Sequence, residues 1–82
     1  MEINRATEVN VEVSNAVDDM FEYHPWTEEQ VSHGKIIRRV LSDAVKLIIG
    51  HVPPSPDRSA AIRKIREARM DCNSAITHGG KY

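Results

Sequence analysis

The sequence predicts an all-α fold, an antiparallel helical hairpin that follows a short N-terminal helix or arm and assembles as a homo-oligomeric helical bundle. A capped apolar stripe spans residues 28–50, a proline-rich turn follows it, and a second stripe spans residues 56–78. An 82-residue chain with one cysteine has a small core and no internal disulfide. We therefore expect further copies of the chain to cover its apolar surface.

Residues 1–20 form an acidic N-terminal arm with an ambiguous pattern. Apolar and polar residues alternate, as in a strand, at Val9, Val11 and Val13. The spacing of the next apolar residues, up to Phe21, is that of a short helix begun by Ser14 or Asn15. We expect this short helix to form, and the alternating segment to be partly disordered or to lie over a neighbouring copy.

The first long helix begins after Thr27, because Thr27 and Gln30 have the spacing of a capping box. Its apolar residues recur every three or four positions until Gly50, which offers a left-handed stop. Gly34 is a weak point inside this helix, costing about 1 kcal/mol relative to alanine. Apolar residues flank the main stripe at Ile36, Leu47 and Ile49, so this helix has more apolar surface than one seam can cover.

The second long helix follows a turn that contains Pro53 and Pro54, which interrupt helical geometry. Ser55 is a suitable N-cap, with Pro56 at the first helical position. Gly79 and Gly80 end the helix. Both long helices have about 23 residues and span roughly 34 Å, so a short turn between them implies antiparallel packing of a domain over residues 21–82.

The net charge of −1 hides a polarised chain. Residues 1–30 carry eight acidic side chains and one arginine, whereas residues 31–82 carry ten lysines or arginines and four acidic side chains. The basic half is suited either to an anionic ligand or to pairing with the acidic arm. The acidic N-terminus is unlike a signal peptide, no apolar run is long enough to span a membrane, and the single thiol suits a reducing cytosol, so we expect a soluble, intracellular protein without a membrane partner.

The sequence contains no pattern that indicates catalysis, a metal site or a cofactor. The four histidines form no i, i+4 pair and have no nearby cysteine, which favours surface or capping roles for His24, His33, His51 and His78. Cys72 lies within an apolar stripe and is expected to be a small, buried hydrophobic residue. We therefore expect a binding protein rather than an enzyme.

Most aromatic residues lie just before the first long helix. Phe21 is expected to act as a hydrophobic staple, whereas Tyr23 and Trp26 could either close the hairpin or stack on a nucleobase. Three cations that could bind phosphate follow within the helix, at Lys35, Arg38 and Arg39. The second helix carries further cations, including Arg69, which form either a second binding surface or a solvated face paired with local acids.

These residues, taken in order, resemble a known family. The matching positions are Tyr23-His24-Pro25, Gln30, Arg38, Pro53, Ser55, Arg58-Ser59-Ala60-Ala61, Glu67-Ala68, Met70, Asn73, Ala75 and Ile76. Over about residues 21–78 the chain resembles the hairpin domain of small phage proteins that bind cyclic oligonucleotides and counter CBASS immunity, and of the related anti-Thoeris sponges. It departs from many members at Trp26, Asp71 and His78, where they carry proline, tryptophan and arginine.

The resemblance implies a homohexamer in the host bacterial cytoplasm that sequesters cyclic dinucleotides, such as cyclic GMP-AMP, between protomers without cleaving them. Some members also bind cyclic trinucleotides at separate sites. By position, Tyr23 would stack on a base and Arg38 would hold phosphate, while His24 and Lys35 are neighbours of suitable chemistry. The candidate ligand-binding residues are Tyr23, His24, Trp26, Lys35, Arg38, Arg39, Arg69, Asn73 and His78.

Two other functions fit the sequence. A sponge of the same fold could bind a cyclic ADP-ribose signal, which makes similar demands on phosphate and adenine recognition. A hairpin could also bind protein or nucleic acid through its basic second helix. Duplex DNA is not an expected partner, because there is no helix-turn-helix spacing and the acidic arm would repel it.

Overall fold

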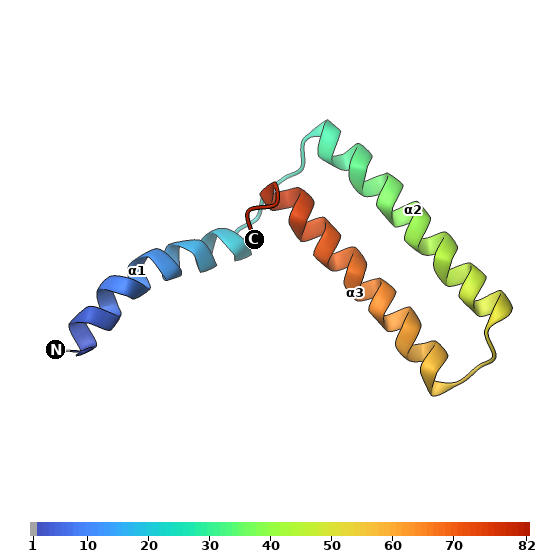
Figure 1. Cartoon of the computed structure of the whole chain (residues 1–82). Coiled ribbons are helices and arrows are strands. Elements are labelled where there is room, and N and C mark those ends of the chain that lie inside the picture. The colour runs from blue at the N-terminus through green and yellow to red at the C-terminus, as the bar shows by residue number, and fades with distance from the viewer. Residues whose placement is uncertain (1) are drawn as a thin grey trace.

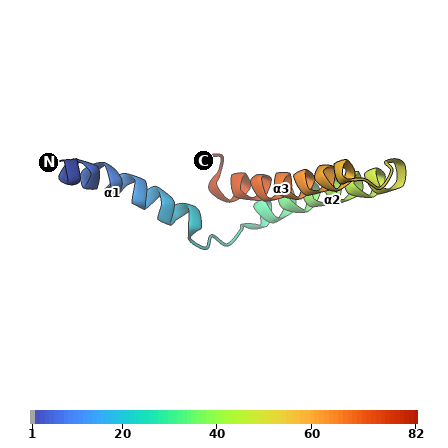
Figure 2. The ribbon, with the colours of Figure 1, turned by 90° about the horizontal axis from the view of Figure 1, so that it is seen from below.

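The computed structural model contains three helices, and it describes the backbone of residues 2–82 and the side chains of residues 11–82. In chain order these are α1 (Glu2–Phe21), α2 (Glu28–His51) and α3 (Pro56–His78). Helices α2 and α3 lie side by side and antiparallel, and α1 projects away from the open end of this hairpin (Figures 1 and 2). The predicted all-α fold is therefore confirmed, with its two long helices packed against each other.

The N-terminal arm differs from the prediction, because helix α1 is continuous from Glu2 to Phe21 and does not begin at Ser14 or Asn15. The alternation of valines misled the sequence interpretation. Val9, Val13 and Met20 are also spaced as one face of a helix, and a helix satisfies its own backbone hydrogen bonds whereas a strand needs a partner. Residues 2–82 contain no strand, so a strand in the arm would have no partner for its backbone hydrogen bonds. The side chain of Val9 lies outside the described residues.

Helix α2 begins as predicted and ends one residue later than predicted. The Thr27 hydroxyl accepts a hydrogen bond from the Gln30 amide at 3.2 Å, and the Gln30 side-chain oxygen accepts one from the Thr27 amide at 2.9 Å. The expected left-handed stop at Gly50 is wrong, since the helix continues to His51 and its C-cap is Val52, with φ −110° and ψ 130°. Pro53 explains this end, because a proline forces the residue before it into extended geometry.

Helix α3 has the predicted bounds and the predicted caps. The Ser55 hydroxyl accepts a hydrogen bond from the Arg58 amide at 3.1 Å, and Pro56 opens the helix. Gly79 ends it with φ 61°, a left-handed conformation that glycine adopts without steric cost. The amide of Gly80 then donates to the carbonyl of Ala75 at 2.9 Å.

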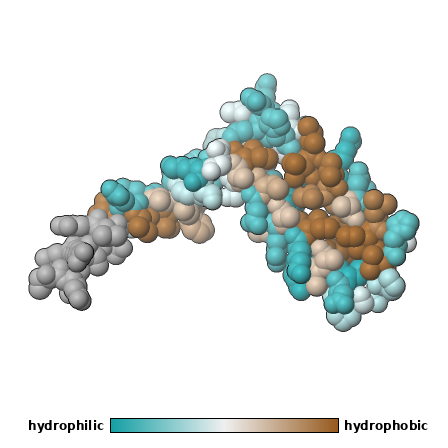
Figure 3. Space-filling model, in the orientation of Figure 1, coloured by the Kyte–Doolittle hydropathy of each residue, from teal (hydrophilic) through white to brown (hydrophobic). Residues whose placement is uncertain are grey.

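The hairpin has a seam but no closed core. Among residues 11–82 the one buried residue is Gly34, and no hydrophobic side chain is buried. The predicted surplus of apolar surface on α2 is confirmed, because Ile36, Leu47 and Ile49 are 60%, 62% and 53% exposed. Figure 3 shows hydrophobic residues gathered across one face of the hairpin. Within residues 2–82, no helix has both the length and the apolar content needed to cross a membrane.

Candidate functional site

A hollow of about 240 Å³ lies at the open end of the hairpin, between the first turns of α2 and the last turns of α3. It brings together five of the nine predicted ligand-binding residues. They are Trp26, Lys35, Arg38, Arg69 and Asn73. Val31 and Gly34 complete the lining, so three cations and an amide surround a partly apolar surface. This combination can hold an anion through the cations while an apolar or aromatic group lies against the wall.

Trp26 forms a fixed wall of this hollow. Its indole Nε1 donates a hydrogen bond to the Thr77 hydroxyl at 2.7 Å, and that hydroxyl donates to the Asn73 carbonyl at 2.8 Å. The ring lies so close to α2 that a Cβ atom at position 34 would overlap Cζ3 of Trp26. The unexplained glycine inside the predicted helix was thus the signal for a close approach, and Thr77 carried no signal in the sequence.

Arg38 lies where the hollow meets two neighbouring surfaces. One is a groove of about 410 Å³ between α2 and α3, in which Leu41, Val45 and Ile65 contribute apolar surface and Arg66 and Arg69 contribute charge. The other is a hollow of about 760 Å³ on α2, whose lining includes Lys35, Arg38 and the predicted Arg39, and also the carboxylate of Asp43. We call these three connected hollows the basic groove. Arg38 is common to all of them.

The cations of the basic groove have no carboxylate partner within the described side chains. The ion pairs found among residues 11–82 use only the carboxylates of Asp19 and Glu29. In particular, the local pairing of the α3 cations with Glu67 and Asp71 that the sequence allowed does not form. The positive charge of Lys35, Arg38 and Arg69 is therefore free to attract an anion.

Phe21, the last residue of α1, and Tyr23, in the segment that joins α1 to α2, lie outside the hollow. The expected hydrophobic staple at Phe21 is wrong, because its side chain is 86% exposed. Tyr23 is 84% exposed, so its ring is accessible for stacking, but it does not line the hollow of its own chain.

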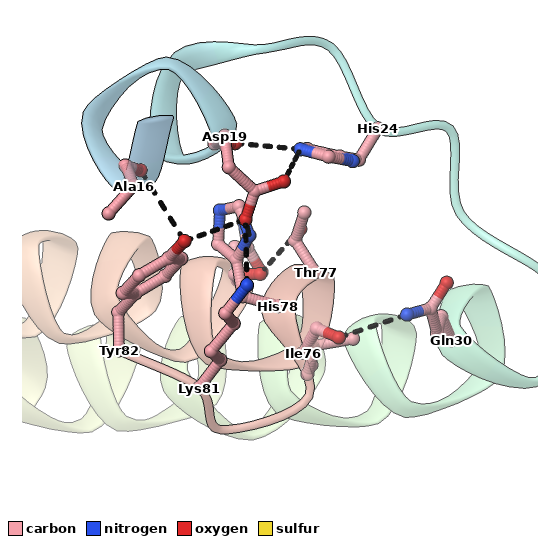
Figure 4. A network of polar contacts seen from close by, with 10 residues as sticks. Ala16, Asp19, His24, Gln30, Ile76, Thr77, His78, Lys81 and Tyr82 are labelled. Carbon is pink, nitrogen blue, oxygen red and sulfur yellow. Dashed lines mark hydrogen bonds and ion pairs between the residues drawn. The ribbon is translucent and has the colours of Figure 1, made fainter. Parts of the chain in front are cut away.

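His24 and His78, the remaining predicted residues, belong to a second cluster around Asp19 (Figure 4). Nε2 of His24 lies 2.7 Å from the backbone oxygen of Asp19 and 3.5 Å from Oδ1 of its carboxylate. Nδ1 of His78 lies 3.9 Å from Oδ2 of the same carboxylate. We call Asp19, His24 and His78 the histidine–aspartate cluster. It joins α1, the linker and the end of α3.

The C-terminal residues Lys81 and Tyr82 also contact the Asp19 carboxylate. The Tyr82 hydroxyl donates to Oδ2 at 2.7 Å, and Nζ of Lys81 lies 3.6 Å from the same oxygen. The hydrogen bond from Tyr82 holds the pKa of Asp19 below its usual value. The contact with Tyr82 is the main cause that raises the pKa of Lys81, and the nearby Asp19 carboxylate raises it further. Sequence reasoning missed Asp19, Lys81 and Tyr82, because Asp19 lies 63 positions before Tyr82 along the chain and local spacing gives no sign that the two meet.

Comparison of the chain with protein-family models, curated proteins and solved structures finds no match. The chemistry of the basic groove and of the histidine–aspartate cluster is therefore the basis for assigning a function.

Proposed function

We propose that the chain is a sponge that binds cyclic dinucleotides, such as cyclic GMP-AMP, without cleaving them. The observation that carries this proposal is the meeting of Lys35, Arg38 and Arg69 beside the fixed Trp26 ring, with no carboxylate partner among the described side chains. A cyclic dinucleotide presents two phosphates and two flat bases. Guanidinium groups bind phosphate oxygens in bidentate fashion, and an aromatic or apolar wall accepts a base.

A second copy of the chain would complete the site. The basic groove is open to solvent on one side, and Ile36, Val40 and Leu47 are each more than half exposed on the same helix as Arg38. A neighbouring hairpin seated on these residues would bury them and close the groove over its ligand. The exposed Tyr23 would then stack on a base in the pocket of a neighbouring protomer. The residue pattern shared with phage anti-CBASS sponges supports a homohexamer that acts in the host bacterial cytoplasm.

The decisive experiment measures capture and chemical fate together. The protein is incubated with a panel of cyclic dinucleotides, cyclic trinucleotides and cyclic ADP-ribose, and native mass spectrometry reports the stoichiometry and the bound mass. We expect a cyclic dinucleotide to leave free solution and to be recovered intact after the protein is denatured by heat. Duplex DNA at physiological salt should compete poorly, because a closed pocket recognises ring shape and not charge alone.

Two charge-reversal variants separate the pocket from general electrostatics. Arg38→Glu should abolish capture, since a carboxylate would face the phosphate in place of a guanidinium. Arg63→Glu is the matched control, because Arg63 is exposed on α3 and does not line the basic groove, so capture should persist. Equal capture by both variants would contradict the proposed pocket. Recovery of a hydrolysed product would contradict sequestration, and selective binding of cyclic ADP-ribose would identify the alternative ligand.

Tyr23→Ala tests the stacking role. A base that loses an aromatic partner loses roughly 1 to 3 kcal/mol of binding free energy, so affinity measured by calorimetry should fall at least several-fold while assembly persists. Tyr23→Phe keeps the ring and should retain binding. Unchanged affinity in a folded Tyr23→Ala protein would show that Tyr23 has no contact with the ligand.

A further inference from the structure

The histidine–aspartate cluster has the composition of a metal site. Asp19 lies near the end of α1, His24 lies in the linker, and His78 is the last residue of α3. One ligand atom from each residue can be chosen so that all three lie within 4.8 Å of one another. Two imidazole nitrogens and a carboxylate oxygen are a donor set that suits Zn²⁺ and related transition metals better than Mg²⁺ or Ca²⁺.

The distances are close to those of a coordinated ion. Nitrogen and oxygen ligands lie about 2.0 to 2.2 Å from Zn²⁺, so neighbouring ligands in a tetrahedral site are roughly 3.4 Å apart. Oδ1 of Asp19 is 3.5 Å from Nε2 of His24, and Oδ2 of the same carboxylate is 3.9 Å from Nδ1 of His78. All three ligand atoms lie within 4.8 Å of one another, so side-chain movements of about an ångström would bring them to coordination distance. His24 would bind the ion as the neutral tautomer that carries its proton on Nδ1, so Nε2 would no longer donate to the Asp19 backbone oxygen.

His78 is the residue that a simple polar contact explains least well. Its side chain is only 7% exposed, yet its contact with Asp19 is longer than a hydrogen bond. Among residues 11–82, its ring has no hydrogen-bond partner and instead meets the rings of His24 and Tyr82 edge-on, at centroid distances of 5.0 and 5.1 Å. A nearly buried imidazole directed at a carboxylate and beside a second imidazole is arranged as a ligand.

We propose that Asp19, His24 and His78 bind one Zn²⁺ per chain and that the ion fixes α1 against the end of the hairpin. The three protein ligands leave a fourth position for water. Lys81 is the natural competitor, because its ammonium group already lies 3.6 Å from the Asp19 carboxylate and would repel the ion. The site is built from residues that do not line the basic groove, so it is independent of the proposed capture of cyclic dinucleotides.

The test uses the full chain, stripped of metal and titrated with Zn²⁺ by calorimetry, with Co²⁺ absorption as a second readout of the coordination geometry. We expect one ion per chain and, with Co²⁺, the visible absorption of a low-coordinate site. His24→Gln and His78→Gln should each weaken binding by at least about tenfold, given that even residues that only orient ligands change affinity by this factor or more. His51→Gln is the matched control, because His51 is exposed at the far end of the hairpin.

Lys81→Ala distinguishes a metal site from a polar latch. Removal of the ammonium group that competes for the Asp19 carboxylate should strengthen Zn²⁺ binding at the proposed site. Zn²⁺ that binds instead to exposed histidines elsewhere on the chain would bind equally well with or without Lys81. Circular dichroism of each variant checks that the helices persist. Binding that is equally strong in wild type, His78→Gln and His51→Gln, or the lack of a stoichiometric site in wild type and Lys81→Ala, would overturn the proposal.

Discussion

At Gly34 the lack of a side chain lets an aromatic ring lie directly on helix α2. Trp26 occupies the space that a Cβ atom would need and is held there by its hydrogen bond to Thr77. Gln30 reinforces the same end of the hairpin, since its side-chain amide donates to the Ile76 carbonyl at 2.9 Å. The open end of the hairpin is therefore fixed by a few polar contacts and one close approach, in a molecule without a buried apolar core among its described side chains.

Gly34→Ala should destabilise the hairpin although alanine favours helices. Alanine gains about 1 kcal/mol of helix propensity, but the added methyl group would displace the Trp26 ring, and such overpacking costs about 1 to 3 kcal/mol. Urea unfolding followed by the fluorescence of the single tryptophan measures both the loss of stability and the change around the ring.

Gly50→Ala is the control for this prediction. A Cβ atom at position 50 would meet nothing within 4 Å, so alanine there should leave stability unchanged or raise it by up to about 1 kcal/mol. If both variants were stabilised equally, the Trp26 ring would not be held against α2 as the structure shows.

At the scale of elements, local signals predicted α2 and α3 and failed for α1. Capping residues, a proline turn and a pair of glycines mark the ends of the hairpin helices, and each acts over a few residues. The valines of the arm fit a strand and a helix equally well, and only the lack of a strand partner decides between them. The basic groove was partly predictable because helical spacing places Lys35 and Arg38 together. The histidine–aspartate cluster was not, because its position depends on the path of the linker.

The C-terminal residue Tyr82 connects two elements that have few other contacts. Its hydroxyl donates to Asp19 and lies 3.4 Å from the Ala16 carbonyl, both on α1. Tyr82→Phe should retain the edge-on contact with His78 but release α1, so amide hydrogen exchange over residues 16–22 should become faster while the α2 and α3 amides are unaffected. Tyr23→Phe is the control, since Tyr23 is exposed and its hydroxyl makes no hydrogen bond within residues 11–82. Unaltered exchange in Tyr82→Phe would show that the tail does not hold α1.

At the scale of the whole molecule, the chain is more extended than a compact domain of its length. Its radius of gyration is 18.4 Å, whereas a compact domain of this length has one of about 12 Å. Its accessible surface is 6987 Å², against roughly 5,000 Å² for a compact protein of this mass. The excess is larger than the roughly 800 Å² that one partner contributes to a standard interface. Each chain therefore has the surface for more than one contact with neighbouring copies.

Leu47 on α2 provides a direct test of assembly. It is 62% exposed in the single chain, where a polar substitution should change the free energy of unfolding by no more than about 0.5 kcal/mol. In an oligomer that buries this face, Leu47→Glu would place an unpaired charge in an apolar interface and disrupt it. Analytical ultracentrifugation should therefore find several copies for the wild type and smaller species for Leu47→Glu. Leu47→Met keeps apolar contact at nearly equal volume and should still assemble. A monomeric wild type at micromolar concentration, or an unchanged assembly of Leu47→Glu, would contradict the burial of this face between protomers and with it a ligand site that neighbouring copies complete.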